Sequence, residues 1–96
     1  MSNARILIVE DEQIIALDIQ ATLRSCGYIV VGHTDNGVDA ILKAAELRPD
    51  LVMMDIGLKG EIDGIAAATQ IRAQFDLPVI FLTAFANQST LERARE

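Results

Sequence analysis

Leu51-Val52-Met53-Met54-Asp55 is the stretch of sequence that decides the fold. Four consecutive apolar residues after Pro49-Asp50 are typical of a short parallel strand that is buried on both faces. The run ends in a carboxylate, and Ile56-Gly57 then begins a loop. In open parallel α/β sheets, ligands bind at the carboxyl ends of the strands. The stretch therefore predicts a buried strand that places Asp55 at a binding edge.

Two further apolar runs end in polar residues in the same way. Ile6-Leu7-Ile8-Val9 leads directly into Glu10-Asp11-Glu12, and Val79-Ile80-Phe81-Leu82 leads into Thr83-Ala84. The carboxyl ends of parallel strands meet at one edge of a sheet. We therefore expect these acids, Asp55 and the threonine hydroxyl to converge at that edge.

The rest of the chain alternates strand patterns with helix patterns. Strands are expected at residues 4–9, 28–32, 51–54 and 79–82, and helices at about 12–26, 38–47, 65–75 and from 87 onward. This alternation predicts an α/β fold, in which right-handed crossovers join the parallel strands of a doubly wound sheet. At 96 residues the chain is expected to form one domain, residues 1–96.

Local signals predict the helix boundaries and the apolar helix faces. Asp11 is expected to cap the first helix, with Glu12 in the first turn. The apolar face of this helix is expected to hold Ile15, Leu17, Ile19, Leu23 and Cys26. The second helix is expected to turn Ile41, Leu42, Ala45 and Leu47 inward. The cluster 33–37 is typical of a turn, with His33 on the surface.

Composition excludes several classes of function. A net charge of −6 and scattered basic residues make the chain a poor nucleic-acid binder, because such binding neutralises phosphates. No apolar run approaches the ~18 residues of a membrane span. The single Cys26 excludes an internal disulfide and a multi-cysteine zinc site, and we expect it to be a small buried side chain. A reduced, cytoplasmic location fits this composition.

The three acids Glu10, Asp11 and Asp55 favour a cation site. Like charges about 4 Å apart repel by roughly 4 kcal/mol at an effective dielectric constant near 20. Oxygen ligands at an open edge suit Mg²⁺, and the backbone carbonyl of Gly57 could add another. A carboxylate beside Mg²⁺ can attack phosphorus as a nucleophile, and Thr83 would lie near the new phosphoryl group.

Each acidic feature also has a simpler interpretation. Glu10, Asp11 and Glu12 could merely cap a helix, and Asp55 could be an ordinary loop acid. These acids occur together at the ends of adjoining strands, and Thr83 follows the end of a third strand. This combination favours a shared functional site over the two simpler interpretations. Gly57, Gly60 and Gly64 do not have the spacing of a dinucleotide or phosphate-binding loop.

In these motifs the chain resembles the receiver domains of two-component response regulators. The match spans nearly the whole chain, and the stretches that carry it are residues 6–12, 50–58, 63–65 and 78–84. The resemblance implies a flavodoxin-like receiver fold with strand order 2-1-3-4. It implies that Asp55 is the phosphoacceptor, charged by a partner histidine kinase or histidine phosphotransfer protein.

The resemblance also implies roles for the surrounding residues. Glu10, Asp11 and Asp55 would hold Mg²⁺ with the Gly57 carbonyl. Thr83 would be the switch hydroxyl that moves the loop and helix after strand 4. The chain would be a regulatory phosphoacceptor, not an enzyme, and this domain would bind neither nucleic acid nor membrane.

Two departures from the family accompany the resemblance. The loop at residues 59–63 is longer than usual, and the family's fifth strand and fifth helix do not appear before Glu96. The domain is therefore expected to be incomplete at its C-terminus, without the lysine that follows strand 5. Lys43 and Lys59 lie elsewhere and are not expected to replace that lysine. The open edge of strand 4 is expected to permit self-association.

Two other functions remain as alternatives. The chain could be a receiver-like protein-interaction module that is not phosphorylated. It could also be an aspartate-nucleophile phosphatase, but those enzymes generally carry a second acid two residues after the nucleophile. Gly57 occupies that position here.

Overall fold

Four parallel strands form the sheet within residues 4–82, the part of the chain that the computed structural model describes. The strands are β1 (Arg5–Val9), β2 (Ile29–Thr34), β3 (Leu51–Asp55) and β4 (Val79–Leu82). Their order is β2-β1-β3-β4, which confirms the predicted order 2-1-3-4.

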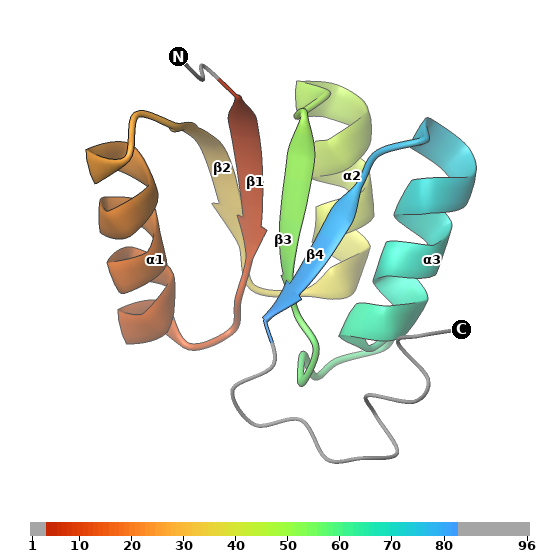
Figure 1. The fold of residues 1–96 in the computed structure, drawn as a ribbon. Helices are drawn as coiled ribbons and strands as arrows, with labels where there is room; N and C mark the ends of the chain where they lie inside the picture. Colours follow the sequence, from red (N-terminus) through yellow and green to blue (C-terminus); the bar gives the residue numbers. More distant parts are fainter. Residues whose placement is uncertain (1–3, 83–96) are drawn as a thin grey trace.

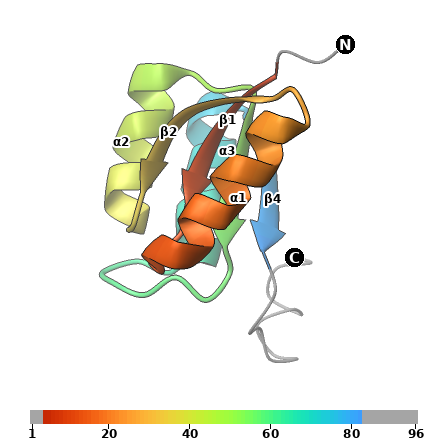
Figure 2. The same cartoon turned by 90° about the vertical axis from the view of Figure 1, so that its left-hand side faces the viewer.

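Three helices cover the two faces of this sheet. They are α1 (Gln13–Ser25), α2 (Gly37–Leu47) and α3 (Gly64–Phe75). Figure 1 shows α1 on one side of the sheet and α2 with α3 on the other, and the view in Figure 2 agrees. The carboxyl ends of all four strands point to the same edge, at the bottom of Figure 1. This doubly wound arrangement is the predicted fold class.

β1 forms the centre of the hydrophobic core. Ile6, Leu7, Ile8 and Val9 are all buried, with at most 1% of each residue exposed. Leu7 and Val9 belong to a buried cluster with residues of α2 and α3. Since successive side chains of a strand alternate between faces, Ile6 and Ile8 point to the face that α1 covers. β1 therefore fixes the position of the residues that follow it.

β3 differs from the expectation that both of its faces are buried. Val52 and Met54 are buried, but Leu51 and Met53 remain partly exposed. The buried side chains face α2 and α3, whereas α1 packs against β1 and β2. The second face of β3 is thus only partly covered by the described residues.

The predicted apolar face of α1 is wrong at two positions. Leu17 is 58% exposed, and Cys26 is an exposed free thiol at the C-cap. Leu17 lies two residues after Ile15, which turns it by about 200° to the other side of the helix. Cys26 follows the last helical residue and so leaves the packed face. Ala16 is the buried residue of α1.

The apolar face of α2 is also shifted from the prediction. Leu42 and Ala45 are exposed, whereas Ala40 and Ala44 are completely buried. The buried alanines belong to the core cluster with Leu7 and Val9. The small alanine side chains allow α2 to pack closely on the sheet, and the larger Ile41 and Leu47 pack at the margin of this contact.

β2 is longer than predicted. His33 and Thr34 were expected in a turn, but they pair with Ile8 and Val9 of β1. A register shift beside Leu7 leaves Val31 as an extra residue, which lengthens β2 relative to β1. Pairing with a buried strand outweighs the local turn preference of the sequence.

Side chains cap two of the described helices at positions that were not predicted from the sequence. Asn36 caps α2 and Asp63 caps α3, since their side chains accept hydrogen bonds from the Asp39 and Ala66 amides at 2.8 Å. The prediction that Asp11 caps α1 is wrong. Glu12 occupies the N-cap position without a side-chain cap bond, and this leaves the Asp11 carboxylate for the acid cluster.

Several predictions concern the C-terminal region. Thr83, Ala84 and the helix expected from Asn87 lie outside the described residues, so these assignments stay predictions. Within residues 4–82, β4 pairs with β3 alone and Ile80 is 50% exposed. Self-association through the β4 edge also stays a prediction. None of the described helices has the length and apolar character needed to cross a membrane.

Candidate functional site

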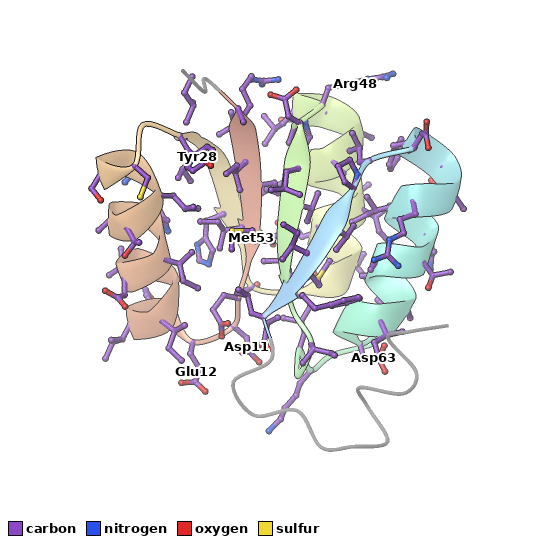
Figure 3. The ribbon with its side chains drawn as sticks, in the orientation of Figure 1. Asp11, Glu12, Tyr28, Arg48, Met53 and Asp63 are labelled. Atoms are coloured by element: carbon purple, nitrogen blue, oxygen red, sulfur yellow. The ribbon has the colours of Figure 1, made fainter. Side chains whose placement is uncertain are left out.

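Strand register brings three carboxylates together at the carboxyl edge of the sheet. Val9 pairs with Met54, so the next residues of the two neighbouring strands, Glu10 and Asp55, lie side by side. Asp11 follows Glu10, and Figure 3 shows it at the lower ends of the strands. One oxygen from each of the three acids lies within 4.8 Å of the others. The predicted convergence of Glu10, Asp11 and Asp55 is confirmed.

Hydrogen bonds that involve backbone groups hold Glu10, the buried acid of this cluster, in place. The residue is only 4% exposed, and its amide donates to the Thr34 carbonyl at 3.0 Å. Its Oε1 accepts a hydrogen bond from the Glu12 amide at 3.1 Å. The Nε2 atom of His33 lies 3.0 Å from the Glu10 carbonyl oxygen. This His33 contact corrects the expectation of a surface turn residue.

Asp55 belongs to the same cluster and is half-buried. Its Oδ1 accepts a hydrogen bond from the Gly57 amide at 2.9 Å, and its carbonyl accepts one from the Leu58 amide at 3.2 Å. The following residue, Ile56, donates its amide to the Leu82 carbonyl at 3.1 Å. These bonds tie the turn after β3 to the end of β4.

The environment raises the pKa of two of these acids. Burial raises the pKa of Glu10 to about 7. The hydrogen bond from the Glu12 amide lowers this pKa, whereas the charges of Asp55 and Asp11 raise it further. Burial also raises the pKa of Asp55, while the hydrogen bond from the Gly57 amide opposes this rise. Without a cation, the cluster therefore favours a bound proton.

The raised pKa of Glu10 predicts an unusual dependence of stability on pH. The folded state holds a proton that the unfolded carboxyl, with a pKa near 4.5, has already lost. The free energy of unfolding of the metal-free protein should therefore fall as the pH rises from about 4.5 to about 7. After allowance for solvent screening, we expect a loss of roughly 1 to 2 kcal/mol.

Urea unfolding at pH 5 and pH 8 in the presence of a chelator measures this loss. Glu10→Gln should flatten the dependence, because the amide carries no charge. Glu12→Gln is the matched control, since Glu12 is a neighbouring exposed acid, and it should behave like the wild type. A wild-type stability that rises over this pH range would contradict the prediction.

The donor set fits a small divalent cation. The three carboxylates offer oxygen ligands close enough to share one ion, and hard cations such as Mg²⁺ prefer oxygen ligands. Burial, and to a smaller extent the neighbouring charges, disfavour the charged forms of Glu10 and Asp55, and a bound cation would offset this cost. The geometry thus supports the predicted type of site.

An open hollow of about 400 Å³ lies beside the acids. It is lined by Asp11, Glu12, Asp55, Gly57 and Lys59. Lys59 was predicted only to lie elsewhere than the family's lysine after strand 5, and the turn after β3 brings it to the rim of the hollow. The spacing of four residues between Asp55 and Lys59 does not by itself reveal this. The tight turn closed by the Leu58 amide is what places Lys59 there.

Comparison with known proteins identifies the family. A model of the response regulator receiver domain matches residues 6–96. The chain therefore belongs to the response regulator receiver family of two-component systems, as the sequence motifs predicted.

Curated relatives share the family but are longer. The transcriptional regulatory protein PdtaR of Mycobacterium tuberculosis is 41% identical over 92 residues, which cover 96% of this chain and 44% of that protein. The response regulator VraR of Staphylococcus aureus is 39% identical over 94 residues, which cover 94% of this chain and 44% of that protein. The chain thus spans less than half the length of these relatives.

Solved receiver structures share the fold. The signal receiver domain of a modulated diguanylate cyclase from Desulfovibrio desulfuricans has a TM-score of 0.92 at 39% identity. The match covers 98% of this chain and 75% of that one. The response regulator domain of Thermotoga maritima CheB has a TM-score of 0.83 at 31% identity, and the match covers 98% of this chain and 72% of that one. The flavodoxin-like receiver fold is therefore established.

Proposed function

We propose that this domain accepts a phosphoryl group on Asp55 and transmits that event as a signalling switch. The observation that carries the proposal is the convergence of Glu10, Asp11 and Asp55 at adjoining strand ends. Asp55 is half-buried, stands beside the open hollow and is oriented by the Gly57 amide. One of its carboxylate oxygens therefore has both a fixed position and access for a donor.

The transfer is a displacement at phosphorus. A carboxylate oxygen of Asp55 forms a new bond to the phosphorus atom of a partner phosphohistidine. The bond between phosphorus and the imidazole nitrogen breaks, and the nitrogen keeps the electron pair. The product is an acyl phosphate on Asp55 and a free histidine on the histidine kinase or phosphotransfer protein.

Glu10, Asp11, Asp55 and the Gly57 carbonyl would hold Mg²⁺ in this proposal. When bound, the ion supplies charge neutralisation for the carboxylates and for the phosphoryl oxygens. Thr83 is proposed as the switch hydroxyl that moves the loop and helix after β4. A regulatory role in the cytoplasm, without enzymatic output of its own, is proposed for the domain.

Incubation with acetyl phosphate tests the proposal directly. Acetyl phosphate donates its phosphoryl group to the Asp55 oxygen and releases acetate. We expect intact-protein mass spectrometry to show the gain of one phosphoryl group with Mg²⁺ and no gain with a chelator. Hydroxylamine should remove the group, since it cleaves acyl phosphates. No gain in the presence of Mg²⁺ would contradict the proposal and favour an interaction module that is not phosphorylated.

A further inference from the structure

Lys59 has a defined place beside the acid cluster. The Leu58 amide donates to the Asp55 carbonyl at 3.2 Å, and Leu58 is only 2% exposed. These contacts fix the turn after β3 on the core. Lys59 is the next residue, is exposed, and lines the hollow that contains Asp11 and Asp55. Its backbone is thus anchored, while its charged end remains in solvent.

The hollow has an uneven distribution of charge. Three of its lining residues are the acids Asp11, Glu12 and Asp55, and Lys59 is the one basic residue among the described residues that line it. An incoming phosphodonor is an anion, so the acids repel it. A cation at the rim offsets that repulsion at the point of entry. The same cation opposes the binding of a metal ion to the acids.

We propose that Lys59 is a positioning residue that draws the anionic phosphodonor to Asp55. The inference rests on the proposed function and deepens it, since the phosphoacceptor role of Asp55 does not by itself require a lysine in this loop. Lys59 acts on the donor through its charge and takes no part in bond formation.

The charge gives two effects of opposite sign. Lys59→Met should slow phosphorylation by acetyl phosphate roughly three- to tenfold at low ionic strength, because the attraction of the donor is lost. The same change should tighten Mg²⁺ binding by roughly two- to fivefold, because a nearby positive charge is removed. Both differences should shrink at high salt, where exposed charges are screened. A merely structural lesion would weaken both properties together.

The chain contains a matched control. Lys43 is its only other lysine and lies on α2, outside the residues that line the hollow. Lys43→Met removes the same charge from the chain and should leave both properties at wild-type values. Lys59→Arg keeps the charge and should retain most of the wild-type rate.

The experiment measures phosphorylation rates with acetyl phosphate at low and high salt, and Mg²⁺ affinity by calorimetry. A slower rate with tighter Mg²⁺ binding in Lys59→Met, but not in Lys43→Met, supports the inference. If both Met variants have the same rates and affinities, or if Lys59→Met weakens both properties, the inference is wrong. If the wild type is not phosphorylated at all, the proposed function fails. The Mg²⁺ measurement then still decides whether the Lys59 charge acts on the cluster.

Discussion

Asp55→Asn is expected to abolish the phosphoryl gain from acetyl phosphate. The asparagine amide is nearly isosteric with the carboxylate but lacks the negatively charged oxygen that attacks phosphorus. The Gly57 amide can still donate to the asparagine oxygen, so the turn should keep its shape. Intact-protein mass spectrometry should show no added phosphoryl group on the variant under conditions that modify the wild type.

Stability measurements separate this loss of chemistry from a loss of folding. Burial raises the pKa of Asp55, so the neutral amide should leave the free energy of unfolding unchanged or raise it by up to about 1 kcal/mol near neutral pH. Asp11→Asn should mainly weaken Mg²⁺ binding, because Asp11 is a proposed ligand and not the nucleophile. Asp18→Asn, an exposed position on α1, is the control and should match the wild type. Undiminished phosphorylation of Asp55→Asn would contradict the assignment of the phosphoacceptor.

The fold could be predicted well because the apolar run of each strand is a local sequence feature, and the shared edge follows from the parallel order of the strands. The apolar run of β3 and its terminal Asp55 lie in a window of five residues. The boundaries of β4 were predicted at the residues where they occur. Once the strands are parallel and neighbouring, their carboxyl ends must share an edge, so the meeting of Glu10 and Asp55 follows from the strand order.

Features that depend on distant contacts could not be predicted in the same way. The length of β2 depends on pairing between His33 and Ile8, which are 25 positions apart in the sequence. The identity of the buried α2 residues depends on the close approach of that helix to the sheet, which favours Ala40 and Ala44 over Leu42. A hydrophobic pattern indicates that a face exists, but packing selects which residues occupy its centre.

The function of the long loop after Asp55 also depends on tertiary structure. Its composition suggests only a glycine-rich connection, and nothing local separates Lys59 from an ordinary surface lysine. The buried Leu58 and its bond to the Asp55 carbonyl turn the loop toward the hollow. The same carbonyl also meets the start of α3 at Gly64, a contact that connects the phosphoacceptor to a helix nine residues further along.

Gly64→Ala is expected to destabilise the domain strongly. Alanine at an exposed helix position normally stabilises relative to glycine by about 0.5 to 1 kcal/mol. Here a Cβ at residue 64 would overlap the backbone carbonyl oxygen of Asp55 and press on the Met54 side chain at 3.3 Å. Either the start of α3 or the end of β3 must move. We expect a loss of about 2 to 3 kcal/mol, which for a domain of this size lowers Tm by roughly 10 to 20 °C.

The displacement should also affect the site, because the carbonyl that is pushed belongs to Asp55 and accepts the Leu58 hydrogen bond. Phosphorylation of Gly64→Ala should be slower than wild type even at temperatures where the variant remains folded. Gly57→Ala is the matched control, since its Cβ would meet only the Asp55 Oδ1 atom at an ordinary 3.5 Å. Thermal unfolding followed by circular dichroism, with acetyl phosphate kinetics at low temperature, measures both effects. Equal Tm values for the two alanine variants would show that α3 can shift away from β3 at little cost, and the proposed coupling between α3 and Asp55 would be wrong.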